Sequence, residues 1–481
     1  MFLLGASYSL QGQQVYSLDD CINLAQDKSP QSAIAKKAFE SVYWSYEAYR
    51  AGLKPQVSLT MNTPGLLRSI VPVVRDDGTQ AFTPQNQAYS TANLIVSQAI
   101  APTGGNLSLV SGLNRQDVFG TDGFVQYNSV PFILRLNQPL FAFNQLKWDK
   151  RTQPLQYQRA EKQYLEALED ISIDICGKYF DLYIARLQMD NAKRNEQIND
   201  SIYTISQGRF RVGKIAENDL LQTELAAFNA RAAVKDAELA VEKARTDLAI
   251  TLGFPENEEF NLVPPRELDR AEIDVDFAVS QARSNRSDAL DFELRRIEAE
   301  RLLSQARANA RLSIDLNASV GLNQAGASLA EAYTAPLDQQ SASVGLNIPI
   351  LQWGRGKASV ESANVEVERV DEQIQLDTRR LLRDVRFQVL DFMQLQDRFL
   401  LAKRSMDIAM RRFDVAKNRY LVGKIDITNL QIAQDESNSA RASYFQTLRQ
   451  YWMAYYQLRR STLYDFVADL PLVVPDLSQN R

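Results

Sequence analysis

The hydrophobic positions of this chain follow a helical period over two very long stretches. From Pro139 to Gly213, and again from Pro349 to Gly423, the sequence holds almost no residue that would end a helix. Apolar residues recur there at steps of three, four and seven, which places them on one helix face. That face contains Ile171, Ile175, Leu182 and Met189 in the first stretch, and Val385, Val389, Phe392 and Phe399 in the second. Helices of this size extend for about 100 Å, so we predict long helices at 140–210 and 351–420 that belong to a rod or tube.

Shorter helical patterns accompany the two long ones. They cover residues 18–54, 215–252, 276–311 and 426–465, and each is about half as long as a long helix. Two of them stacked end to end would therefore match one long helix in length. This match favours an assembly of parallel columns.

Polar and apolar residues alternate strictly between the helices. The alternation predicts strands at 55–62, 130–138, 313–322 and 341–349, each with one apolar and one polar face. A soluble sandwich and a membrane barrel both show this pattern, so the alternation leaves both open. Four strands are too few to close a barrel, and lipid does not tolerate an open sheet edge. A membrane barrel would thus require several copies of the chain.

The connection between the first two strands is much longer than its counterpart in the second half. Within it, residues 90–113 hold two alternating runs around the turn sequence Pro-Thr-Gly-Gly at 102–105. We interpret this segment as an extra hairpin at the outer loops, where insertions are tolerated. A structural cap is the preferred role, and ligand binding is the alternative.

One phrase occurs in both halves of the chain. RFRVGKIAENDL at 209–220 returns as RYLVGKIDITNL at 419–430, and the preceding segments align without a gap. Such agreement indicates an internal duplication. It divides the chain into a first structural repeat at 17–252, a linker at 253–275, a second repeat at 276–465 and a tail at 466–481. We interpret residues 1–16 as a truncated signal peptide, with an ordered N-terminal segment as the alternative.

Composition narrows the classes of function. The 481 residues include no histidine, which is the commonest general base and metal ligand. No other set of residues suggests chemistry, so we predict no enzyme activity, no catalytic residue, no metal site and no cofactor. The net charge of −5 argues against a nucleic-acid partner. No run of eighteen apolar residues exists, so no membrane-spanning helix is predicted.

The doubled phrase, the strand-to-helix segments QPLF at 138–141 and IPIL at 348–351, and the half-length helix pairs together resemble the TolC-like outer-membrane efflux proteins. The resemblance covers residues 17–465. It implies an α+β membrane protein in which three chains supply four strands each to a 12-stranded β-barrel that continues into a long α-helical barrel. It also implies an outer-membrane location reaching into the periplasm of a Gram-negative bacterium. Expected partners are two further copies of the chain, outer-membrane lipid, a periplasmic adaptor and an inner-membrane pump.

The resemblance places the two copies of the phrase at the periplasmic mouth, as helical tips that dock the adaptor. The residues that we expect to face the adaptor are Arg209, Val212, Gly213, Lys214, Arg419, Val422, Gly423 and Lys424. The residues that we expect at the periplasmic gate are Asp219, Tyr420, Asp426, Asn429 and Ile432. The family closes its mouth with acidic rings near the second tip, and Tyr420, Asn429 and Ile432 stand there instead. Asp219 from the first tip, with Asp426, Asp435 and Glu436 nearby, would then supply charge, or Ile432 would form a hydrophobic constriction.

The expected function is that of a passive exit duct in a tripartite efflux pump or a type I secretion system. A periplasmic coiled-coil rod or adaptor is the alternative, because long helices with a buried face suit it equally well. The four strands favour the duct.

Overall fold

A computed structural model describes residues 14–74, 77–120, 123–255, 258–267, 270–421, 424–425 and 427–473. The chain divides into two compact units. The helical unit contains Met1–Glu40, Arg159–Ala289 and Asp377–Arg481, and the sheet unit contains Ser41–Gln158 and Leu290–Leu376. Helices α2, α3, α6 and α7 have residues in both units.

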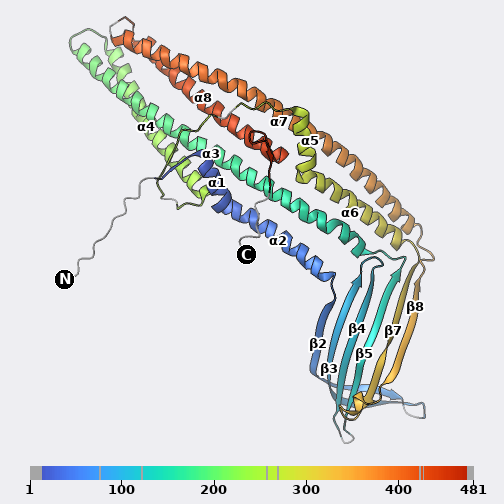
Figure 1. The fold of residues 1–481 in the computed structure, drawn as a ribbon. Helices are drawn as coiled ribbons and strands as arrows, with labels where there is room; N and C mark the ends of the chain where they lie inside the picture. Colours follow the sequence, from blue (N-terminus) through green and yellow to red (C-terminus); the bar gives the residue numbers. More distant parts are fainter. Residues whose placement is uncertain are drawn as a thin grey trace, which may run out of the picture. The chain divides into compact units, whose positions relative to one another are not determined.

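The sheet unit is built around one antiparallel sheet with the strand order β2-β3-β4-β5-β7-β8 (Figure 1). Its strands are β2 (Gln56–Val74), β3 (Gln80–Ile100), β4 (Gly105–Val118), β5 (Phe124–Leu140), β7 (Ser313–Gly326) and β8 (Leu337–Asn347). The short 3₁₀ helix η1 (Glu331–Tyr333) lies against β5 and β7. All six strands are long enough for the ~9–11 residues that cross a bilayer.

The number of strands in the sheet differs from the predicted number. The sequence predicted four strands in one chain, with the hairpin at 90–113 outside the sheet, whereas six strands pair in one sheet and β3 and β4 lie between β2 and β5. The predicted turn is present, because the Gly104 N–H donates to the Ile100 carbonyl at 2.8 Å. Gly104 has a φ of +75°, which glycine adopts without strain. The hairpin is therefore part of the sheet and not a cap over it.

Eight α-helices are described. They are α1 (Leu18–Lys28), α2 (Pro30–Gly52), α3 (Gln145–Arg211), α4 (Glu217–Leu252), α5 (Val275–Asn285), α6 (Ser287–Asn309), α7 (Arg355–Leu421) and α8 (Ile427–Thr462). The two long helices α3 and α7 have 67 residues each. Among the helices described, none combines the length and the apolar stretch that a membrane span requires.

Two predicted helices are each broken once. The pattern at 18–54 breaks at Ser29, between α1 and α2, and the pattern at 276–311 breaks at Arg286, between α5 and α6. Both residues are extended, with φ/ψ of −67°/151° and −69°/152°. Pro30 follows Ser29 and disfavours helical angles in the residue before it. The Ser29 hydroxyl then caps α2 by accepting from the Ser32 N–H at 3.0 Å.

The core of the helical unit follows the predicted apolar faces. Seven of the eight residues named from the helical period are buried, and Met189 is half-buried. Residues of α8 complete this core, including the fully buried Leu448, Tyr451 and Trp452. The Trp452 Nε1–H donates to the Arg266 carbonyl at 3.0 Å, which fixes the irregular segment after β6 (Phe260–Leu262) against α8.

Candidate functional site

The first tip closes with a Schellman motif at the end of α3. The Lys214 N–H donates to the Arg209 carbonyl, and the Gly213 N–H donates to the Phe210 carbonyl, both at 2.8 Å. Gly213 has a φ of +71°, the left-handed conformation that the motif requires. The sequence phrase thus encodes a sharp stop of α3 and an immediate return into α4.

The second tip shows the same bond at the matching position. The Lys424 N–H donates to the Arg419 carbonyl at 2.8 Å. Val422, Gly423 and Asp426 lie outside the described residues, as does the side chain of Tyr420.

The tips present basic and apolar side chains to solvent. Val212 is 68% exposed, and the side chains of Arg209, Lys214, Arg419 and Lys424 are also exposed. A partner surface with carboxylates around an apolar residue would complement this arrangement.

The other described residues that we expect at the gate lie near the starts of α4 and α8. Asp219 accepts a hydrogen bond from the Ala216 N–H at 3.3 Å and so caps the start of α4. Asn429 is exposed, and Ile432 is 45% exposed. Asp219 therefore has a structural role at the tip in addition to its negative charge.

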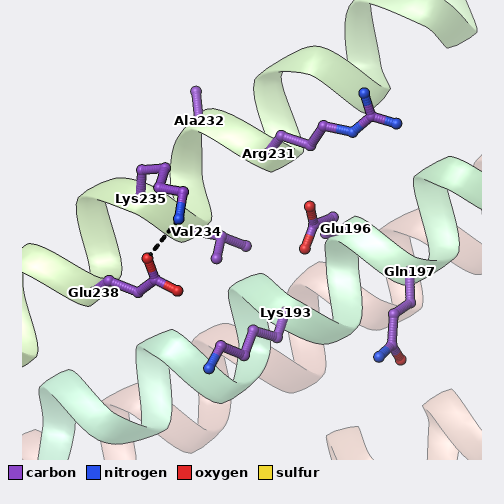
Figure 2. Close-up of a pocket in the computed structure, with 8 residues that line it drawn as sticks. All are labelled: Lys193, Glu196, Gln197, Arg231, Ala232, Val234, Lys235 and Glu238. Atoms are coloured by element: carbon purple, nitrogen blue, oxygen red, sulfur yellow. Dashed lines mark hydrogen bonds and ion pairs between the residues drawn. The ribbon is translucent and has the colours of Figure 1, made fainter.

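A charged groove between α3 and α4 was missed by the sequence analysis. It has a volume of about 570 Å³ and is lined by Lys193, Glu196, Gln197, Arg231, Ala232, Val234, Lys235 and Glu238. Figure 2 shows Lys193, Glu196 and Gln197 on one helix and the other five residues on a neighbouring helix. In the sequence these charges are typical of a solvated helix face, and only the pairing of α3 with α4 brings them together.

Ion pairs organise this groove. The Lys235 Nζ lies 2.9 Å from Glu238 Oε2, and this hydrogen bond, helped by Lys193, holds the pKa of Glu238 below its usual value. The Arg231 guanidinium lies 3.0 Å from Asp200 Oδ1 and joins α4 to α3. Side chains of both charges thus line the groove. No group of three metal-binding side chains occurs among the described residues.

The sheet has two chemically distinct faces. One row of paired residues crosses all six strands and is polar throughout: Gln56, Ser97, Ser108, Arg135, Ser319 and Ser341. The next row, on the opposite face, is apolar over five strands: Val57, Val96, Leu109, Leu134 and Val320.

The apolar face is open to the surroundings. Val57 is 67% exposed and Leu59 62% exposed on β2, and Leu346 is 62% exposed on β8. In Figure 1 the described helices of the sheet unit lie beyond the ends of the strands and not over a face of the sheet. Such a large exposed apolar surface marks contact with a membrane or another protein.

Solved structures share the fold of this chain. A membrane protein from Pseudomonas aeruginosa superposes with a TM-score of 0.65 at 16% identity, over 94% of this chain and 91% of that chain. The Campylobacter jejuni CmeC outer membrane channel gives 0.65 at 14% identity, over 100% and 96%. The open state of the Neisseria gonorrhoeae MtrE outer membrane channel gives 0.58 at 16% identity, over 92% and 88%. A comparison with curated protein sequences gave no match. The architecture is therefore that of the outer-membrane channels.

The family follows from the sequence. The family model described as outer membrane efflux protein matches residues 90–253 and 278–462, which is more than half of the chain. This protein belongs to the outer membrane efflux protein family, and the predicted TolC-like relationship is confirmed. It is a transport protein of the outer membrane, which favours the channel over the coiled-coil rod.

Proposed function

We propose that this protein is the exit duct of a tripartite efflux pump or a type I secretion system. Three copies form the duct in the outer membrane of a Gram-negative bacterium and extend into the periplasm. The duct conducts its cargo passively, and an inner-membrane pump supplies energy and selects the cargo.

The observation that carries this proposal is the exposed apolar face of the six-stranded sheet. At about 25 cal/mol per Å² of apolar surface removed from water, such a face is stable only when lipid or protein covers it. The opposite face carries serine, asparagine and glutamine side chains, and the Asn137 Nδ2–H donates to Asn317 Oδ1 at 2.6 Å across β5 and β7. A wall that is apolar outside and polar inside suits a water-filled passage through lipid.

The adaptor docks at the two tips. At the first tip the docking residues are Arg209, Val212 and Lys214, and Gly213 fixes the turn. The docking residues of the second tip are the matching ones of the repeated phrase, Arg419, Val422, Gly423 and Lys424. The gate of the duct is formed by Asp219, Tyr420, Asp426, Asn429 and Ile432 at the same end of the hairpins. Opening is a repacking of the tip helices and involves no chemistry.

A site-specific photo-crosslinking experiment in the native bacterium tests this function. A photoreactive amino acid at Val212 is expected to capture a periplasmic adaptor, identified by mass spectrometry. The matched control is the same residue at Val365, which is 55% exposed on the part of α7 in the sheet unit. Recovery of the protein in the soluble fraction without detergent, or capture of the adaptor at Val365 and not at Val212, would refute the proposal.

Proline substitutions at the tips test the docking sites separately. Gly213→Pro replaces a left-handed glycine and removes an N–H. Gly423→Pro makes the same change at the matching position of the sequence, and we expect both variants to lose transport while trimers remain in the membrane. Wild-type transport in both variants would exclude the tips as docking sites.

A further inference from the structure

Both edges of the six-stranded sheet are open. In the described part of the chain, β2 pairs only with β3 and β8 pairs only with β7. The outer N–H and C=O groups of two strands thus have no partner strand. Soluble proteins normally protect such edges with charges, prolines or bulges.

One half of each edge strand lacks these protective features. In β2, Pro64, Pro72, Arg68 and a register shift all fall after Asn62, and residues 56–62 contain no charge, proline or glycine. In β8, the single charged residue is Asp338, and residues 339–347 contain no charge and no proline. Residues 56–62 and 339–347 are therefore suited to pair with another strand.

The register within one chain shows how these two halves meet. The row that begins at Gln56, the first residue of β2, reaches Ser341, about six residues before the end of β8. With strands about 4.8 Å apart and residues about 3.3 Å apart, this stagger corresponds to a tilt of about 40°. Closed barrels have tilts of about 35–45°, so the sheet is staggered like a section of a barrel wall.

The same stagger, continued by one more strand, aligns β8 of one copy with β2 of the next. The polar faces match only if odd residues of β8 lie opposite even residues of β2, so Ser341 would lie opposite residue 62 or 64 of the neighbouring β2, and Asn347 opposite residue 56 or 58. The two unprotected halves thus fall on each other. Because the sheet has an even number of antiparallel strands, β8 and β2 also run antiparallel, and the apolar face stays continuous across the joint.

We propose that the partner at each edge is a second copy of this chain, and that three copies close a ring of eighteen strands. This inference rests on the trimer of the proposed function. The eighteen strands replace the twelve that four strands per chain would give, because the hairpin β3–β4 adds two strands to the sheet of each copy. Barrel diameter grows roughly in proportion to strand number, so the ring is about 1.5 times as wide as a twelve-stranded one. A ring of this size holds an aqueous channel and admits cargo of larger cross-section.

Disulfide cross-linking tests the joint. Ser343→Cys lies on the polar face of β8, and Ser58→Cys, Thr60→Cys and Asn62→Cys lie on the same face of β2. Each double variant is oxidised in membranes and run on a non-reducing gel. We expect the yield of covalent trimer to be highest for the double variants with Thr60→Cys or Asn62→Cys, because a disulfide forms only where the Cα atoms lie within about 7 Å. The control pairs Ser343→Cys with Ser108→Cys on the central strand β4 and should give no cross-link.

Electron microscopy of the detergent-purified protein then counts the strands. Eighteen strands around a threefold axis support the inference. A covalent dimer with twelve strands would overturn the inference. A trimer whose ring has twelve strands because β3 and β4 lie outside it would also overturn it. Adaptor capture at Val212 together with a twelve-stranded ring would refute this inference alone, whereas an eighteen-stranded trimer that captures no adaptor would refute the docking function alone.

Discussion

The guanidinium of Arg459 on α8 lies 2.8 Å from Oε1 of the buried Glu169 on α3. The same guanidinium lies 3.2 Å from Oδ2 of Asp465. The other oxygen of this carboxylate, Oδ1, accepts a hydrogen bond from the Tyr455 hydroxyl at 2.7 Å. The side chain of Glu169 is only 4% exposed, and its Oε2 accepts no hydrogen bond within the part of the chain described. One cation thus joins two helices and the segment after α8.

The first prediction concerns the pH dependence of stability. Burial raises the pKa of Glu169 to about 7, although Arg459 acts in the opposite direction. The folded state therefore favours the protonated carboxyl. The resulting stabilisation is complete below the unfolded pKa of about 4.5 and is lost as the pH rises through 7.

Glu169→Gln removes this titration. We expect the free energy of unfolding of the variant to rise relative to the wild type between pH 4.5 and 8, by on the order of 3 kcal/mol at most. Thermal unfolding in detergent across this range measures the difference. The control is Asp170→Asn, whose carboxylate is 53% exposed. A difference between Glu169→Gln and wild type that stays constant with pH would contradict the prediction.

The second prediction compares the two adjacent arginines of α8. Arg459→Met leaves Glu169 and Asp465 without their shared cation, which typically costs about 3–5 kcal/mol for a buried pair. Arg460→Met breaks a pair with Asp170 that is partly exposed, and should cost about 1 kcal/mol or less. The two melting temperatures at neutral pH provide the measurement. Equal losses for both variants would show that burial does not set the strength of these pairs.

The helices of this protein were largely predictable, and the neighbours of the strands were not. A helical period that continues over a long stretch with few glycine or proline residues specifies both the helix and its buried face, as Ile175 and Val389 show. The breaks at Ser29 and Arg286 were missed because a break needs only one extended residue and leaves the period of both flanks intact.

The alternation in residues 90–113 also predicted two strands correctly. It did not place them in the sheet, because a period of two determines which face a residue occupies and not which strand lies beside it. The groove around Lys193 and Lys235 was missed for a related reason: charges on separate helices form a site only through their packing.

The third prediction tests the tip geometry at the end of α3. Gly213→Ala places a side chain at a φ of +71° and should weaken the tip by about 1 kcal/mol. Gly208→Ala is the matched control, since Gly208 lies within α3 with open space around it and alanine is the better helix former. Hydrogen exchange of the Lys214 amide is expected to speed up in the first variant only. Unchanged protection in Gly213→Ala would argue against the Schellman bond to Arg209.

The fourth prediction tests the pairing of β5 with β7 within one chain, which connects the strands of its two halves. A Cβ at Gly321 would lie 2.4 Å from the Phe132 carbonyl oxygen and 2.7 Å from the Ile133 Cα. These are backbone atoms beside a register shift, so they cannot move aside without breaking the pairing of the strands. Gly345, on β8, offers the control because a Cβ there meets Asp315 at ordinary distances of 3.7 and 3.8 Å.

We therefore expect Gly321→Ala to lower the melting temperature of the detergent-purified protein and to reduce its yield in membranes. Gly345→Ala should leave both unchanged, since its added methyl group fits the space present. Equal behaviour of the two variants would mean that the close approach of β5 to Gly321 does not contribute to holding the sheet together. A selective loss at Gly321 would show that the pairing of β5 with β7 depends on a residue without a side chain at this point.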